Sequence, residues 1–152
     1  MGSLNYIKGD LIKTEARVIV HGCNCFCNMG SGVAKAIKLH FPEAFQADQE
    51  TTRGDKKKLG TISYAESKGK LVVNAYTQHG YGHQARQIKG KSDLFEYRKF
   101  VSCLAAIREL TSEDDTIAFP KIGAGLAGGD WDKIEEMIRK GLHDRNVLIH
   151  VI

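Results

Sequence analysis

Residues 21–37 read HGCNCFCNMGSGVAKAI and follow directly on an apolar segment. That segment, Val18 to Val20, is mostly β-branched, which is typical of a short buried strand. We expect the strand to end near Cys23, where small and polar residues begin. The sequence therefore places the end of a buried strand immediately before a loop rich in glycine.

A helix is predicted after this loop. Val33, Ile37 and Phe41 recur every four residues on one face, and Ser31 is suited to capping, so the helix should begin at about Ser31. The first N–H groups of a helix lack intrahelical partners and carry roughly half a positive charge, and the glycines at 30 and 32 let the backbone approach a ligand closely. The segment suits a phosphate group, although a plain strand-to-helix turn would have the same sequence.

A second glycine cluster lies far along the chain. Residues 119–129 read FPKIGAGLAGG and follow an apolar strand predicted over Thr116 to Phe119. In an open α/β sheet, loops after neighbouring strands border the crevice in which such folds bind ligands. We therefore expect the two glycine loops to face one ligand, such as the pyrophosphate of a nucleotide.

At this point the sequence resembles the macrodomains that bind ADP-ribose. The matching pieces are KGDL at 8–11, CNCFCNMGSGVAKAI at 23–37 and FPKIGAGLAGGDW at 119–131. The most similar branch contains ADP-ribose-1''-phosphate phosphatases and terminal ADP-ribose glycohydrolases. The resemblance implies an α/β protein, a three-layer α/β/α macrodomain with a mixed central sheet, formed as one domain by residues 1–152.

The remaining elements are expected from local pattern. Helices flanking a buried mixed sheet give a three-layer arrangement. Lys56 to Lys58 should be a solvated turn in a surface loop. The expected strands are 5–8, 61–65, 71–76 (paired with 61–65 as a hairpin) and 147–152, and the expected helices are 33–40, 43–50, about 93–110 and one from Trp131.

The resemblance also implies which residues bind the ligand. Asp10 would accept a hydrogen bond from the adenine amino group, and Asn24 would contact the distal ribose, although both residue types are also common in turns. The expected ligand-binding residues are Asp10, Leu11, Asn24, Gly30, Ser31, Gly32, Val33, Ala34, Gly123, Ala124, Gly125, Leu126 and Ala127.

The catalytic residues of the resembled glycohydrolases have no counterpart in this chain. Those enzymes use a lysine that attacks the anomeric carbon and an aspartate in the second glycine loop, and the aligned positions here are Gln78 and Ala127. An amide cannot form the lysine adduct. We expect Asn24, His79 and Asp130 to carry the chemistry, with the alternatives that Asp130 only caps a helix and that His79 only holds a phosphate or solvent. The loop that begins at Thr77 could close over a ligand.

The cysteines do not suggest a metal site. Cys23, Cys25 and Cys27 alternate after His21, whereas structural zinc sites usually use pairs separated by two to four residues, so no metal and no cofactor are expected. Buried thiols are the favoured interpretation, and a nucleophilic Cys27–His79 pair stays open. With no secretory signal before them, the four cysteines indicate a reduced, cytoplasmic context without disulfides.

Composition favours a soluble protein with an anionic ligand. The 152-residue chain has a net charge of +4 and no apolar run long enough to cross a bilayer. The expected partner is ADP-ribose or ADP-ribose-1''-phosphate, with an ADP-ribosylated macromolecule as the alternative and no membrane partner, and the chain is expected to be a monomer. The leading prediction is a hydrolase that acts at the distal ribose, most simply on ADP-ribose-1''-phosphate. A glycohydrolase of modified protein or nucleic acid, a non-catalytic ADP-ribose reader and a nucleic-acid binder are the alternatives.

Overall fold

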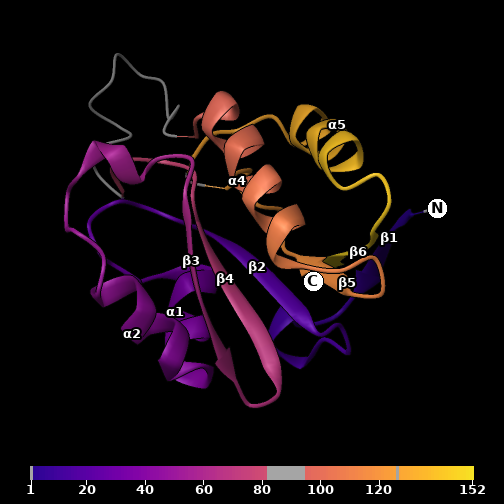
Figure 1. The fold of residues 1–152 in the computed structure, drawn as a ribbon, viewed down its shortest axis with the longest axis horizontal. Helices are drawn as coiled ribbons and strands as arrows, with labels where there is room; N and C mark the ends of the chain where they lie inside the picture. The colour runs from indigo at the N-terminus through magenta and orange to yellow at the C-terminus, as the bar shows by residue number, and fades with distance from the viewer. Residues whose placement is uncertain (1, 82–94, 126) are drawn as a thin grey trace.

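The computed structural model describes residues 2–81, 95–125 and 127–152, and its centre is a six-stranded sheet (Figure 1). The strand order is β1-β6-β5-β2-β4-β3. Strand β3 is antiparallel to β4, and the other neighbouring strands are parallel, so the sheet is mixed as expected. The strands are β1 (Ser3–Lys8), β2 (Val18–Cys23), β3 (Ile62–Ser67), β4 (Lys70–Tyr76), β5 (Thr116–Phe119) and β6 (Asn146–Val151).

Helices cover both faces of the sheet and complete the three layers (Figure 1). Alternate residues of a strand point to opposite faces, so Val18 and Val20 pack with α4 and α5 whereas Ile19 packs with α1 and α2. Strand β2 is thus buried on both faces, as its apolar composition predicted. The helices are α1 (Gly32–His40), α2 (Pro42–Gln49), α4 (Tyr97–Leu110) and α5 (Trp131–Gly141), and the short 3-10 turns are η1 (Leu11–Lys13) and η2 (Lys56–Lys58).

Two local expectations are wrong. Helix α4 begins at Tyr97 rather than near Asp93. Residues 93 and 94 lie outside the described residues, and Glu96 has an extended backbone (φ −107°, ψ 103°), with its N–H bonded to Thr77 O over 2.8 Å. Lys58 is not solvated. It is buried, and its Nζ donates to Cys25 O over 3.0 Å.

The parallel strands β2, β4 and β5 lie side by side and end at the same edge of the sheet. Strand β2 ends at Cys23 opposite Tyr76 of β4, and β5 ends at Phe119. The loops that follow these strands therefore start close together, and they carry both glycine clusters. No helix of the described residues is long and apolar enough to span a membrane.

Candidate functional site

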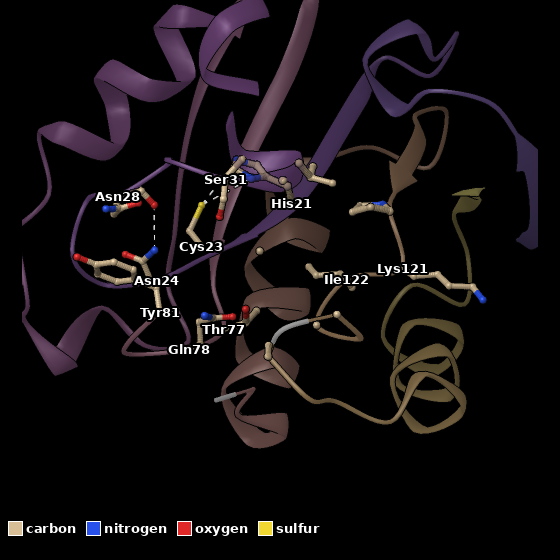
Figure 2. Close-up of a pocket in the computed structure, with 18 of the residues that line it drawn as sticks. His21, Cys23, Asn24, Asn28, Ser31, Thr77, Gln78, Tyr81, Lys121 and Ile122 are labelled. Carbon is tan, nitrogen blue, oxygen red and sulfur yellow. Dashed lines mark hydrogen bonds between the residues drawn. The ribbon is translucent and has the colours of Figure 1, made fainter. Parts of the chain in front are cut away.

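The loops after β2, β4 and β5 enclose a cavity of about 350 Å³ at this edge of the sheet (Figure 2). Its walls come from three segments distant in the sequence, which meet because their strands are neighbours. Both glycine loops contribute, as the sequence predicted. The lining residues are His21, Gly22, Cys23, Asn24, Asn28, Gly30, Ser31, Gly32, Val33, Ala34, Thr77, Gln78, Tyr81, Pro120, Lys121, Ile122, Gly123, Gly125 and Ala127.

The first glycine loop presents the start of α1 to the cavity. Ser31 occupies the N-cap position, but its hydroxyl makes no capping hydrogen bond, and the first intrahelical bond runs from Lys35 N to Ser31 O (3.2 Å). The preceding N–H groups of the first turn therefore have no intrahelical acceptor. Gly32 has φ +58°, a conformation that favours glycine, and a Cβ built there would meet nothing within 4 Å. This loop is open toward the cavity and offers backbone donors to an anion.

The second glycine loop is held by packing. Gly123 has φ +75°, its carbonyl accepts from Gly129 N over 2.7 Å, and a Cβ built there would lie 2.3 Å from the Phe95 ring. Gly123, Gly125 and Ala127 line the cavity. Ala124 does not, and Leu126 lies outside the described residues.

A smaller pocket of about 70 Å³ adjoins the cavity and shares Val33 and Pro120 with it. Asp10 and Leu11 line this second pocket, so the structure brings them next to the first glycine loop. The Asp10 side chain is exposed, and its Oδ1 accepts from Ile12 N over 3.0 Å as the cap of η1. A carboxylate has two oxygens, so this turn contact leaves acceptor capacity free.

Asn24 lines the cavity and also stabilises its own loop. Its Oδ1 accepts from Phe26 N and its Nδ2 donates to Asn28 O, both over 2.9 Å. Both the ligand interpretation and the turn interpretation of this residue thus have a structural basis. The amide keeps one N–H and one acceptor site for a ligand.

His79 and Asp130 are not among the residues that line the cavity. His79 packs edge-on to Phe26, with ring centroids 4.8 Å apart, and its Nε2 lies 3.0 Å from Gly54 O, which can only accept. Asp130 caps α5: its Oδ1 accepts from Asp132 N over 3.1 Å. The structure therefore places neither side chain among the described residues that line the cavity beside Asn24.

The sequence prediction missed His21 and Thr77 as cavity residues and treated Gln78 only as the position of a missing lysine. His21 lies near the end of β2 and pairs with Asn74 of β4, and Thr77 and Gln78 follow directly after β4. The parallel pairing of β2 with β4 places them there, because residues that follow paired strand ends share an edge, and no motif in the sequence marks these positions. Tyr81 and Asn28 also line the cavity.

His21 is a buried, neutral imidazole in the cavity wall. The Asn74 Nδ2 donates to Ala44 O over 2.9 Å, so its Oδ1 faces His21 Nε2 at 2.6 Å, and that nitrogen must carry the proton. Burial lowers the His21 pKa to about 4, which the Asn74 hydrogen bond only partly offsets. Its Nδ1 is therefore an acceptor at neutral pH.

The thiols near the cavity are protonated and unbridged. Burial raises the pKa of Cys23 well above its usual range and that of Cys25 to about 11. All four cysteines are free. Within the described part of the chain, no cluster of three or more His, Cys, Asp or Glu side chains is arranged to hold a metal ion.

Two glycine loops and a helix start around one crevice define an α/β protein with a pocket suited to a phosphorylated ligand. A family model described as Macro domain matches residues 20–138, well over half of the chain. The chain therefore belongs to the macrodomain family, a family that binds ADP-ribose.

Three relatives show the range of this family. An uncharacterized 17.5 kDa protein of Enterobacteria phage T4 is 37% identical, over 89% of this chain and 87% of its own length. An ADP-ribose 1''-phosphate phosphatase of Meyerozyma guilliermondii is 26% identical, over 99% of this chain and 98% of its own length. A DNA ADP-ribosyl glycohydrolase of Mycobacterium tuberculosis is 24% identical over 89% of this chain, which corresponds to 37% of that larger protein.

Solved structures show the same fold. A Bacteroides thetaiotaomicron protein superimposes with a TM-score of 0.78 at 26% identity, covering 98% of this chain and all of that one (100%). Thermosipho africanus DarTG in complex with ADP-ribose superimposes with a TM-score of 0.74 at 20% identity, covering 97% of this chain and 42% of that one.

Proposed function

We propose that this macrodomain binds ADP-ribose in the cavity and hydrolyses a derivative of it at the distal ribose. The observation that carries the proposal is that two glycine loops, more than 80 residues apart, line the same cavity. The open start of α1 supplies backbone donors for the pyrophosphate. The adjoining pocket beside Asp10 suits the adenine, which leaves the end near Asn24 for the distal ribose.

Among derivatives of ADP-ribose, the 1''-phosphate is the best supported substrate. The described residues that line the cavity include no Asp or Glu, and Asn24, Thr77 and Gln78 supply neutral hydrogen-bonding groups at the ribose end. A wall without carboxylates tolerates an extra phosphate, because like charges placed close together in a poorly solvated site repel strongly. The similarity to an ADP-ribose 1''-phosphate phosphatase over nearly the full length of both chains points the same way.

Two measurements test the proposal. Isothermal titration with ADP-ribose should give saturable binding that free phosphate alone does not reproduce, and incubation with ADP-ribose-1''-phosphate should release inorganic phosphate. ADP-ribosylated DNA and protein serve as competing substrates. Release of ADP-ribose from either one, without phosphate release from the 1''-phosphate, would replace the phosphatase by a glycohydrolase.

A non-catalytic reader is the second candidate, and Gln78 and Ala127 favour it. They occupy the positions where the resembled glycohydrolases carry a lysine and an aspartate. A reader would bind ADP-ribose and turn over none of the substrates. For the hydrolase we expect Asn24→Ala to lower turnover more than binding, because the lost amide contacts only the ribose end; equal losses would remove Asn24 from the chemistry.

A further inference from the structure

Gln78 presents a hydrogen-bond acceptor of fixed orientation to the cavity. Its Nε2 donates to Gly80 O over 2.8 Å. A carbonyl can only accept, so the amide nitrogen must face Gly80 and the amide oxygen is the atom left for the opposite side. In the described part of the chain no donor is bonded to that oxygen, and the half-buried side chain lines the cavity.

Thr77 carries a buried hydroxyl without a partner. Its backbone is fully paired, because its N–H bonds to Cys23 O (3.3 Å) and its carbonyl accepts from Glu96 N (2.8 Å). The hydroxyl oxygen has no hydrogen-bond partner among the described residues, although the residue is only 1% exposed. Buried hydroxyls are normally paired, and one left over in a pocket wall points to a ligand or a water molecule as its partner.

Both groups lie at the end of the cavity assigned to the distal ribose. Figure 2 shows Thr77 and Gln78 on the same side of the cavity as Asn24 and Tyr81. An ordered water needs two to four polar partners of both kinds, and a hydroxyl donor beside a carboxamide acceptor provides the first two. The spare N–H of Asn24 is a third candidate partner.

Building on the proposed hydrolysis, we propose that Gln78 and Thr77 hold the water molecule that attacks the substrate. A glutamine that orients water is an established device in phosphoryl transfer. Gln78 accepts a hydrogen bond from the water and Thr77 donates one to it. Gln78 is then a catalytic residue of a different kind from the lysine found in the resembled glycohydrolases.

The reaction balances without a covalent intermediate on the protein. The water oxygen bonds to the phosphorus of the 1''-phosphate, and the bond between phosphorus and the ribose 1''-oxygen breaks. A carboxamide is not a base, so one water proton passes to the departing 1''-oxygen, directly or through a phosphate oxygen. The products are ADP-ribose and inorganic phosphate, and no oxidant, metal or other co-reactant is required.

The first test is Gln78→Met, which keeps the length of the side chain and removes its hydrogen bonds. We expect kcat for ADP-ribose-1''-phosphate to fall about 100-fold, the usual cost of a misplaced reactant, with KM and ADP-ribose affinity changed by less than about 3-fold. Gln46→Met, on the exposed side of α2, is the matched control and should keep wild-type kinetics. In ¹⁸O-labelled water, one solvent oxygen should appear in the released phosphate.

The second test is the pair Thr77→Val and Thr77→Ser. Valine keeps the shape and removes the unpaired hydroxyl, so we expect kcat to fall about 10-fold while the melting temperature stays equal or rises. Serine keeps the hydroxyl and should restore most of the activity. A purely structural role for Thr77 would instead lower the melting temperature of the valine variant and leave kcat unchanged.

The outcomes separate this inference from the proposed function. Wild-type turnover by Gln78→Met, an equal loss of kcat and ADP-ribose affinity, or a phosphorylated or ADP-ribosylated protein recovered by acid quench and mass spectrometry would each overturn the water-holding role. Wild-type protein that binds ADP-ribose and releases no product would overturn the hydrolysis itself, and this role with it.

Discussion

The two glycine loops reach the same cavity but need glycine for different reasons. Gly32 and Gly123 both have a positive φ, +58° and +75°. A side chain on Gly32 would project into open space, whereas one on Gly123 would collide with the Phe95 ring at 2.3 Å. Packing therefore requires glycine at position 123 but not at position 32, so we expect substitutions in the two loops to separate ligand binding from stability.

The largest effect is expected from Gly32→Glu. The carboxylate would project beside the start of α1, where we place the pyrophosphate, and both its bulk and its charge oppose that anion. ADP-ribose affinity should fall more than about 1,000-fold, or about 4 kcal/mol, in isothermal titration.

Gly69→Glu is the matched control for this variant. Gly69 also has a positive φ (+79°) and open space around its Cβ position, but it lies in the β3–β4 turn, away from the cavity. Both variants should lose similar stability, about 1–2 kcal/mol for the strained backbone. A folded Gly32→Glu protein with unchanged affinity would remove the first loop from the ligand site.

Gly123→Ala should be the most destabilising small change in either loop. The added methyl meets the Phe95 ring and the residue must keep φ near +75°, so we expect a loss of about 3 kcal/mol in the free energy of unfolding. Gly125→Ala, in the same loop with nothing within 4 Å, should stay within about 0.5 kcal/mol of wild type. Urea unfolding measures both, and equal effects would mean that packing does not distinguish the two positions.

His21, in the wall of the cavity, makes the stability of the folded protein depend on pH. Its folded pKa of about 4 lies below the ordinary 6.5, so the unfolded chain binds more protons between these values and stability falls as the pH drops through this window. Burial raises the pKa of Asp48, which changes stability with pH in the opposite direction. The contribution of His21 is therefore measured as the difference in stability between the wild type and a variant without the imidazole.

His21→Gln isolates that contribution. Glutamine can still donate to Asn74 but does not titrate. The free energy of unfolding of the variant, relative to that of the wild type, should therefore be roughly 2 kcal/mol higher at about pH 4.5 than at about pH 7. Urea unfolding at the two pH values gives the difference. A constant difference would mean that folding does not lower the pKa of His21.

Features set by local pattern could be predicted from the sequence. The apolar run at Val18 to Val20 became β2, the hairpin formed as expected, and both glycine loops follow buried strands. The capping alternative named for Asp130 is the arrangement found. In each case the deciding interactions lie within a few residues of one another, so composition and spacing were sufficient.

Features set by contacts between residues far apart in the sequence could not be predicted from it. The residues just before α4 are held by carbonyls of Ala127 and Thr77, and the His79 ring faces the carbonyl of Gly54. Lys58 is buried, and its Nζ donates to the carbonyl of Cys25 in the first loop. The cavity position of Gln78 follows from the pairing of β2 with β4, which no local pattern specifies.

The smallest predicted effect separates capping from ligand binding at Ser31. An N-cap serine usually contributes about 1 kcal/mol, but this hydroxyl makes no capping bond and lies on the cavity wall. Ser31→Ala should therefore change the free energy of unfolding by less than about 0.3 kcal/mol and weaken ADP-ribose binding about 3-fold to 10-fold, the worth of one hydrogen bond. Thermal unfolding and titration of the same sample measure both quantities. A stability loss near 1 kcal/mol with unchanged affinity would return Ser31 to the role of a simple cap and make the first loop resemble the second.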